Sequence, residues 1–542
     1  MMMEDFRTEQ ESLIREENNE EENSTNRSSN INTNYEKALS AIGFGKFHLL
    51  LLFICGLANS SDAIEILCVS FVLPSAECDL NMSSTDKGYL SSITFLGMMI
   101  GGYVWGTLGD VLGRKYILIS ALFFNALFGI LAGLSQTFEI LLLCRFLSGI
   151  GVGGSVPIVW SYFSEFIPKD IRGRMICCLA SSWFFGNLLV ILFAYILLNN
   201  FQINISLFSG YIIINNWKMF MIASALPSAI TCVLLLMLPE SPKFCLYNGK
   251  SSEARKILKN IFIYNNGNSN PEKKRILNEI LDDLKLSERP SLSDNDDDRE
   301  LLFLPNRTTR FTKSIIQNSK DIIKKTKCLF SKAYIFKTSL ILCIMFAICF
   351  GYYGLWIWLP ELYKRMALTG GSPCSKNFIP TNGTDNTNKS CRIDNSVFES
   401  SFISALSNLP GNLFTIFFID KMGRNIVTSM SLILSGLSVF GIPFITKESQ
   451  GVLLATIFGG INVVTFNSFG CTATELYPTK LRSSALGVQY VAGRLGAILG
   501  NILFGVLVDT SCYVPLLTIS GLLIMSGILS FKLPESSNLD MD

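Results

Sequence analysis

The sequence has little charge and almost no histidine. Asp, Glu, Lys and Arg make up 16% of its 542 residues and His48 is the one histidine, whereas soluble domains carry about 25% charged residues. The 15 cysteines show no metal-ligand spacing, and no nucleophile stands with a base in a known motif. We therefore expect no catalytic centre, no metal and no cofactor. The net charge of +2 gives no reason to expect a nucleic-acid partner.

Apolar residues are abundant, at 49% of the total. A run of roughly 20 apolar residues is long enough to cross a bilayer, and twelve such runs are present. We expect an all-α, polytopic membrane protein with 12 transmembrane helices. No basic and then apolar leader precedes the first run, so we expect that run to act as its own insertion signal. The predicted spans are 46–72, 88–109, 116–134, 139–165, 175–198, 217–238, 336–360, 398–418, 425–445, 450–473, 484–507 and 513–531.

Positive charge collects in alternate loops, which indicates the orientation of the chain. Loops that stay in the cytosol retain Lys and Arg, and the loops after the second, fourth, eighth and tenth spans hold most of these cations. The opposite loops have few, apart from the one after the seventh span, and several carry sequons for N-glycosylation. We therefore expect both termini in the cytosol, at a vesicle or plasma membrane. We expect glycans on Asn81, Asn204, Asn382 and Asn388.

The spans divide evenly around one long polar insertion. An amphipathic helix is expected within that insertion at Ser251–Tyr264, and an acidic run follows at Asp294–Asp298. The predicted organisation is a disordered acidic tail (1–45), a six-helix bundle (46–238), a cytosolic central loop (239–335), a second six-helix bundle (336–533) and a short cytosolic tail (534–542).

The two groups of spans repeat each other. A shift of 310 residues, without a gap, places Asp110 on Asp420, Gly113 on Gly423, Arg114 on Arg424, Glu165 on Glu475, Pro168 on Pro478 and Arg172 on Arg482. Hydrophobicity alone does not produce such a match. We therefore expect a duplicated six-helix unit, an arrangement typical of transporters.

The repeated residues have two interpretations. The glycines allow a sharp turn, and each arginine can reach the glutamate that closes a nearby helix. In one interpretation these residues are topology signals and surface ion pairs worth at most about 1 kcal/mol each. In the other they form a cytosolic gate whose ion pairs form in one conformation and break in another. The gate would comprise Asp110, Gly113, Arg114, Glu165, Arg172, Asp420, Gly423, Arg424, Glu475 and Arg482.

Several motifs resemble those of a known superfamily. The stretches "GTLGDVLGRK", "RFLSGIGVGG", "SEFIPKDIRGR", "PESPKFCLYNGK", "DKMGR" and "TELYPTKLR" are similar to the signatures of the major facilitator superfamily, in its sugar- and organic-ion-porter branch. The stretches "DAIEILCVSFVLPSAECDL", "GGSVPIVWSYFSEF" and "YYGLWIWLP" resemble synaptic vesicle glycoprotein 2-like members. The loop at 361–397 is too short for the large luminal domain of synaptic vesicle glycoprotein 2. The resemblance implies the major facilitator fold and a transport function.

Ionisable residues inside spans are rare and usually functional. At about 1.5 Å of rise per residue, Asp62 and Arg145 fall at about the same depth, so we expect them to pair. Asp62 would then carry a coupling proton, as the resemblance to proton-coupled sugar porters implies, or the pair would only fix helix packing. Glu65 lies one turn further out, either as part of this group or as a solvated carboxylate near the interface.

A second group of polar and aromatic residues is expected near the midplane, where amides and stacked rings suit a sugar or an organic ion. Arg494 is its cation and would bind an anionic or polar solute, or pack against Asn462 or Gln489. The individual aromatic residues could instead face lipid or the core. The candidate solute site is Trp183, Asn187, Tyr352, Tyr353, Trp356, Trp358, Asn412, Asn462, Asn467 and Arg494.

The function expected from these features is secondary transport of a small polar solute by alternating access, with possible coupling to protons, by a chain that works as a monomer. The alternative is a vesicle-membrane scaffold that transports nothing. Cys374 and Cys391 share one loop on the oxidising side and could be joined or unpaired.

Overall fold

The part of the chain that the computed structural model describes contains twelve helices long and apolar enough to cross a membrane, as the sequence predicted. The structure describes residues 33–200, 204–207, 212–267, 275–281, 323–332, 334–369, 371–374, 393–477 and 479–533. The spanning helices are α2 (Lys46–Ser75), α3 (Ser84–Leu112), α4 (Arg114–Gly133), α5 (Phe138–Ser164), α6 (Lys169–Ala194), α7 (Asn216–Leu235), α13 (Ile335–Trp356), α15 (Asn395–Leu406) with α16 (Asn408–Met422), α17 (Arg424–Gly441), α18 (Glu448–Glu475), α19 (Thr479–Leu507) and α20 (Tyr513–Ser530). A π-helical turn, η1 (Tyr195–Asn200), extends α6.

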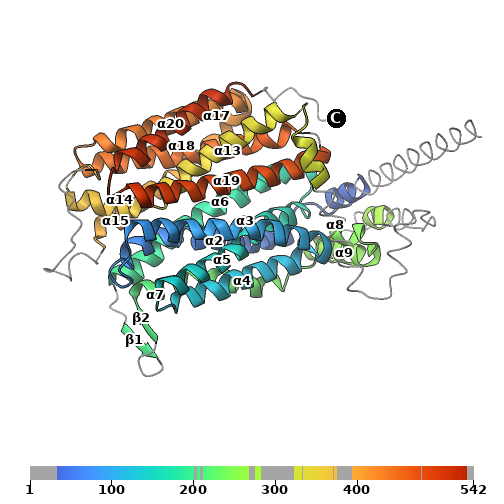
Figure 1. Ribbon diagram of the computed structural model, residues 1–542. Helices are drawn as coiled ribbons and strands as arrows, with labels where there is room; N and C mark the ends of the chain where they lie inside the picture. Colours follow the sequence, from blue (N-terminus) through green and yellow to red (C-terminus); the bar gives the residue numbers. More distant parts are fainter. Residues whose placement is uncertain are drawn as a thin grey trace, which may run out of the picture.

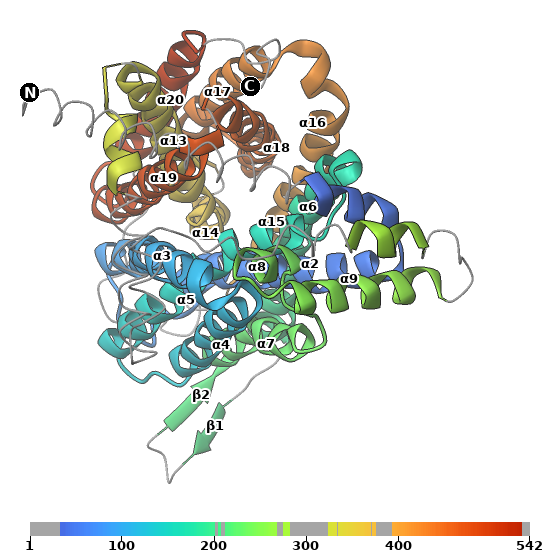
Figure 2. The same ribbon diagram turned by 90° about the vertical axis from the view of Figure 1, so that its right-hand side faces the viewer.

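The helices form two halves that lie side by side (Figure 1). Helices α2 to α7 make the N-terminal half and α13 to α20 the C-terminal half, and Figure 2 shows the two groups end-on. Within the halves α3 packs on α5 and α13 on α19, and α3 also packs on α19 across the boundary. The boundary between the halves is therefore where residues of both can build one site.

The two ends of the bundle differ. The outer end carries a hairpin of β1 (Asn204–Leu207) and β2 (Ile212–Asn215) and the short helix α14 (Leu359–Thr369). The inner end carries α8 (Pro242–Tyr247) and α9 (Ser251–Asn266), opposite the hairpin in Figure 1. The charge pattern predicts that the inner end faces the cytosol.

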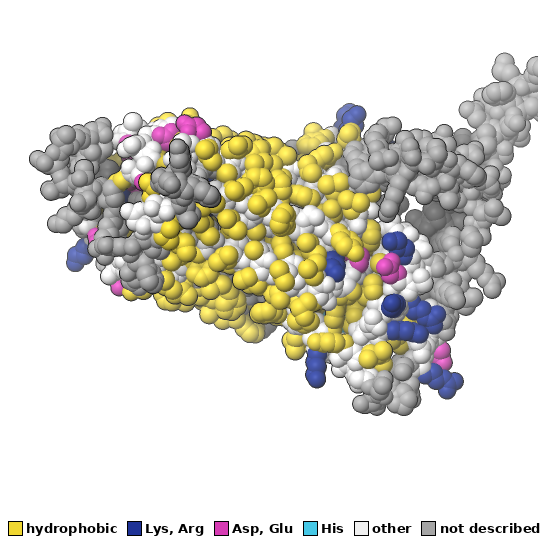
Figure 3. All heavy atoms as spheres, turned by 90° about the horizontal axis from the view of Figure 1, so that it is seen from below, with side chains coloured by type: hydrophobic (Ala, Val, Ile, Leu, Met, Phe, Trp, Pro, Cys, Tyr) yellow, Lys and Arg dark blue, Asp and Glu magenta, His cyan; other side chains and the backbone are white. Residues whose placement is uncertain are grey.

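Close helix contact explains why small residues recur in these spans. A Cβ atom on Gly97 of α3 would lie 2.1 Å from the carbonyl oxygen of Phe146 on α5, so only glycine fits there. Small residues at such contacts let helix backbones approach in a membrane. Larger apolar side chains cover the outside, and in Figure 3 they form a broad belt along most of the molecule, with charged groups gathered toward its ends.

One expectation about the N-terminal tail is wrong. Residues 33–42 form a helix that packs against the inner end of the N-terminal half, with Tyr35 and Leu39 buried. The Tyr35 hydroxyl donates to the Glu165 carbonyl oxygen at 2.5 Å. The prediction of a disordered tail through residue 45 missed this helix because its apolar residues are too few for a span. The amphipathic helix predicted from Ser251 is α9, whereas the acidic run at 294–298 lies outside the described residues.

Candidate functional site

Two buried charges of the N-terminal half pair with each other, and only one of them was predicted to do so. Arg145 on α5 is 1% exposed, and its Nη1 lies 2.6 Å from Oε1 of Glu65 on α2, which is 0% exposed. The same nitrogen donates to the Glu65 carbonyl oxygen at 3.3 Å. The predicted pair of Asp62 with Arg145 is therefore wrong, and Glu65 is no solvated carboxylate.

Asp62 has a polar partner in place of a cation. Its Oδ1 accepts a hydrogen bond from the Ser155 hydroxyl of α5 at 2.7 Å. Its Oδ2 is buried and has no hydrogen-bond partner among the described residues. A serine hydroxyl can donate to a carboxylate and can accept from a carboxylic acid. The site can therefore hold Asp62 in either protonation state.

Arg494 of α19 lies where the halves meet. Its guanidinium is 5.7 Å from the ring centre of Phe95 on α3, 5.5 Å from Tyr353 and 4.5 Å from Tyr490. It is 7% exposed, its Nε lacks a partner, and no described carboxylate forms an ion pair with it. The rings attract the cation, and the Tyr353 and Tyr490 hydroxyls lie within hydrogen-bonding reach of it, so Nε is the donor left without a described partner.

A small cavity lies further toward the outer end, between the halves. Its volume is about 20 Å³, and residues of both halves line it, among them Asn187 of α6 and Trp356 of α13. Trp356 stacks on Tyr352 with ring centres 5.5 Å apart, and the side chain of Trp183 is within hydrogen-bonding reach of the Tyr352 hydroxyl. The structure thus brings these four predicted residues together in a region with room for about one water molecule.

The other predicted solute residues lie elsewhere. Trp358 is fully buried against Phe504 of its own half, with ring centres 5.6 Å apart. Asn467 donates to Asn412 at 2.9 Å and Asn462 donates to Ser435 at 3.4 Å, and these contacts join helices of the C-terminal half. We therefore interpret these four residues as part of the internal packing of the C-terminal half: Trp358, Asn412, Asn462 and Asn467.

At the inner end, the repeated arginines pair with the glutamates that the repeat selected. Arg114 lies 2.6 Å from Asp110 and 3.7 Å from Glu165, and Arg424 pairs with Glu475. The glycines before the two arginines have φ angles of +108° and +83° at Gly113 and Gly423, which L side chains rarely adopt. Both halves therefore use the same turn and the same pair.

Every one of these inner-end pairs stays within one half. Arg172 also pairs within the N-terminal half, with Glu36 of the 33–42 helix at 2.6 Å. Glu240, which was not predicted, accepts from the Lys115 backbone nitrogen at 3.0 Å; the quoted "PESPK" motif was the available signal. Arg482 lies on α19, and the side chain of Asp420 lies outside the described residues. A gate that ties the halves together at this end is not seen among the described contacts.

The outer end holds the ion pairs that do cross between the halves. Lys87 of α3 and Glu361 of α14 are central to them, and sequence reasoning missed both. The cations after the seventh span were the available signal, because they break the rule that outer loops lack positive charge.

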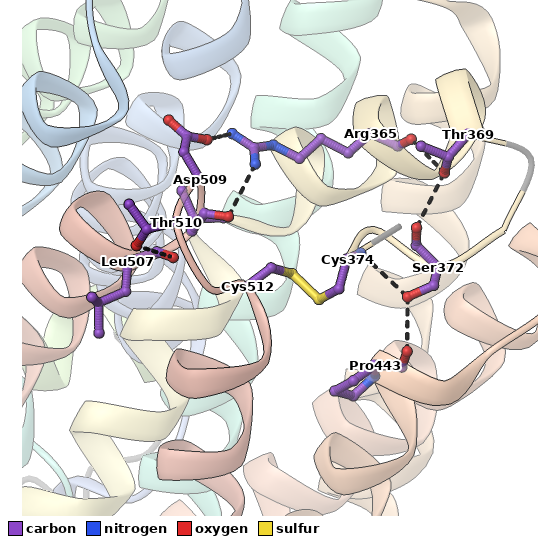
Figure 4. The surroundings of a disulfide bond; sticks show 10 residues. Arg365, Thr369, Ser372, Cys374, Pro443, Leu507, Asp509, Thr510 and Cys512 are labelled. Carbon is purple, nitrogen blue, oxygen red and sulfur yellow. Dashed lines mark hydrogen bonds and ion pairs between the residues drawn. A yellow bond between two sulfur atoms is a disulfide. The ribbon is translucent and has the colours of Figure 1, made fainter. Parts of the chain in front are cut away.

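The predicted disulfide is also corrected. Cys374 bonds to Cys512, which joins the loop after α14 to the start of α20, beside the pair of Arg365 with Asp509 (Figure 4). Cys391 lies outside the described residues, as do the sequons at Asn382 and Asn388. Asn81 and Asn204 are exposed at the outer end, where glycans were predicted.

Comparison with known proteins shows which family this chain belongs to. A family model described as "Sugar (and other) transporter" matches residues 14–322, and one described as "Major Facilitator Superfamily" matches residues 395–539. Synaptic vesicle glycoprotein 2C of Rattus norvegicus is 28% identical over 93% of this chain and 80% of its own. Synaptic vesicle glycoprotein 2B of Homo sapiens is 29% identical over 93% and 85%. A partially occluded inward open structure of the xylose transporter XylE from E. coli has a TM-score of 0.62 at 15% identity, over 91% of this chain and 99% of that one.

Twelve spanning helices in two halves, with buried charges and stacked rings where the halves meet, define a membrane transporter of the major facilitator class. The chain belongs to the sugar (and other) transporter family, whose model covers more than half of it. Its similarity to synaptic vesicle glycoprotein 2 proteins extends over nearly the whole chain.

Proposed function

We propose that this chain moves a small polar solute across its membrane by alternating access, with the solute bound between the two halves. The observation that carries the proposal is Arg494, a buried cation that faces aromatic rings from both halves and has no carboxylate partner among the described residues. A cation held in this way can bind a solute that carries an anionic or strongly polar group. An organic anion satisfies this better than a neutral sugar.

The neighbouring groups suit the remainder of such a solute. Asn187 has a buried Nδ2 without a hydrogen-bond partner among the described residues, and it lines the cavity together with Trp356. Amide donors fix the orientation of a polar ligand, and flat rings cover its apolar faces. Because the cavity is about 20 Å³, the solute enters only after the halves have moved apart.

Asp62 is the proposed proton carrier. It is buried, it forms no ion pair with a described residue, and its Ser155 contact serves both protonation states. Glu65 and Arg145 would hold α2 against α5 beside it. The word vesicle in the relatives' names supports a vesicle membrane for this chain too, and the charge pattern supports an inner end that faces the cytosol.

The proposal is tested first by ligand binding. Sugars, organic anions and organic cations are screened for those that raise the melting temperature of the detergent-solubilised protein, since a ligand of the folded state stabilises it. Any hit is then tested for uptake into proteoliposomes. Arg494→Gln should weaken binding of an anionic hit by about tenfold or more, the loss expected for a charged hydrogen bond. A flat screen, with no uptake, would favour the scaffold function instead.

Proton coupling has a separate test. Asp62→Asn should abolish accumulation driven by a pH gradient while exchange of solute across the membrane continues, because only the proton-carrying step is removed. Ser155→Ala is the companion variant, which removes the hydroxyl partner but keeps the carboxyl. If Asp62→Asn accumulates solute as the parent does, Asp62 carries no coupling proton.

A further inference from the structure

The ion pairs between the halves that the described residues form lie at the outer end and centre on Lys87. Its side chain is 0% exposed, and its Nζ lies 3.1 Å from Oε1 of Glu361, which is 3% exposed. Lys87 belongs to α3 of the N-terminal half and Glu361 to α14 of the C-terminal half. This buried ion pair therefore ties one half to the other.

A second pair crosses the same boundary. Glu77, just after α2, forms ion pairs with both Lys87 at 3.1 Å and Lys364 of α14 at 3.0 Å. Acidic and basic side chains thus alternate along the boundary between the two halves, which we call the seam. We call Lys87, Glu361, Glu77 and Lys364 the outer lock.

The helices beside the outer lock are in close contact across the two halves. A Cβ atom on Gly88 would lie 2.9 Å from the Cα of Gly505 on α19, and the Ser92 hydroxyl donates to the Ile498 carbonyl oxygen at 3.1 Å. The small cavity lies directly inside this seam, because Pro360 and Tyr363 of α14 line it. The helix that carries Glu361 therefore also covers the cavity on its outer side.

The charge of Glu361 persists over a wide range of pH. Burial alone would raise the pKa of Glu361, but Lys87 and Arg365 outweigh burial and lower it to about 2. Acid therefore does not release the pair at any ordinary pH, and separation of the two helices is what must break it.

We propose that the outer lock controls opening of the cavity to the outer side, and that the pair of Lys87 with Glu361 must break in every transport cycle. This inference rests on the proposed alternating access. Each partner keeps a second counter-ion when the other is removed: Lys87 keeps Glu77, and Glu361 keeps Arg365 at 3.2 Å. Single variants therefore leave no stranded buried charge and should fold.

The test measures access to the cavity from outside and needs no solute. Ser401 of α15 lines the cavity, is 8% exposed, and its hydroxyl bonds within its own helix. Ser401→Cys provides a thiol there, and a membrane-impermeant maleimide is added outside proteoliposomes. A protease in the same medium cleaves the central loop of inverted molecules. The full-length band then reports only molecules whose outer end faces the reagent, and the chain with Ser401 gives the background.

Lys87→Met and Glu361→Gln should each speed labelling by about tenfold or more, since a buried pair is lost. The double variant should be no faster than the faster single variant, because both remove one interaction. Lys87→Arg should stay slow. Asp509→Asn is the matched control: it breaks the pair of Asp509 with Arg365, which also lies at the outer end but within the C-terminal half, at 2.8 Å.

Unchanged labelling in both single variants would overturn the outer lock, and so would an equal rise in Asp509→Asn. If Lys87→Met does not yield monodisperse protein, Glu361→Gln carries the same test. A chain that labels as expected but moves no solute would keep the outer lock and refute the transport proposal. Intact transport with unchanged labelling would do the reverse.

Discussion

The two ends of the bundle use ion pairs in opposite ways. At the inner end Arg114 pairs with Glu165 and Arg424 with Glu475, and both pairs join helices of one half. At the outer end Lys87 pairs with Glu361 across the two halves and is fully buried. The same chemistry therefore stiffens each half at one end and fastens the halves together at the other. In this structure the described ion pairs therefore join the halves at the outer end.

The difference also reflects exposure. The inner-end side chains are 13% to 24% exposed in these two pairs, so water screens them. Lys87 and Glu361 are 0% and 3% exposed, and their attraction acts in a medium of low polarity. The outer lock should therefore control conformation more strongly than any inner-end pair.

The largest effect should come from a buried pair inside one half. Arg145→Met leaves Glu65 buried without its cation, and the free energy of unfolding should fall by about 3–5 kcal/mol. Arg172→Met is the control, because its pair with Glu36 is about 30% exposed on both sides; it should cost at most about 1 kcal/mol. Melting temperatures in detergent measure both. Equal losses would show that burial does not set the strength of these pairs.

Loss of the disulfide should have the next largest effect. Replacing Cys374 and Cys512 by serine frees the loop after α14 from α20, and a disulfide of this kind typically contributes about 2–4 kcal/mol. The melting temperature should fall, whereas Cys343→Ser, at an exposed thiol on α13, should leave it unchanged. A double serine variant as stable as the parent would mean that the outer end needs no covalent tie.

The inner-end pairs should contribute least to stability. Arg114→Gln and Arg424→Gln should each lower the free energy of unfolding by about 1 kcal/mol or less, since both pairs are partly exposed. The two losses should be similar because the repeat places the same pair in each half. Neither variant should speed labelling of the Ser401→Cys thiol from outside, and a large increase would contradict the division of roles between the two ends.

Acid should weaken the inner-end pair before it weakens the outer lock. Burial raises the pKa of Glu165, and Arg114 offsets this only in part. Glu165 therefore takes up its proton more readily than an ordinary glutamate, and the inner-end pair weakens first as pH falls. The pKa of Glu361 is depressed from 4.5 to about 2, so its stabilising contribution is complete above pH 4.5 and is lost only toward pH 2. Because the thiolate is the form that reacts with maleimide, the labelling rate at each pH is divided by that of a small free thiol in the same buffer. This relative rate should stay flat from about pH 8 to 5, and a rise within that range would contradict the assignment.

The sequence predicted the spans and the inner-end pairs because both features recur along the chain. Twelve apolar runs of sufficient length recur along the chain, and one offset of 310 residues selected the partners of Arg114 and Arg424. Such regularities survive in a single sequence. The glycines of the two turns were predicted for the same reason, and their positive φ angles at Gly113 and Gly423 explain the residue choice.

The buried charges were harder because depth along a helix does not give the direction of a side chain. Asp62 and Glu65 are three residues apart on α2 and differ in depth by only about 4.5 Å. The long Arg145 side chain reaches the outer of the two, and Ser155 takes the inner one. Lys87, Glu361 and the true partner of Cys374 were missed for a related reason: each contact joins loops or helix ends far apart in sequence, and no local pattern marks it.

The central claim is that ion pairs at the outer end, and not at the inner end, hold the halves in this conformation. Spin labels can report both ends at once, at Tyr89 and Tyr513 outside and at Tyr116 and Met422 inside, all of them exposed. The exposed thiols of the described residues, Cys177, Cys178, Cys328, Cys343 and Cys471, are first replaced by serine. Pulsed electron–electron double resonance measures the distance between the two labels of each pair. Lys87→Met should lengthen the distance between the outer labels and shorten the distance between the inner labels. Unchanged distances in Lys87→Met, with a shift in Arg114→Gln instead, would contradict the account.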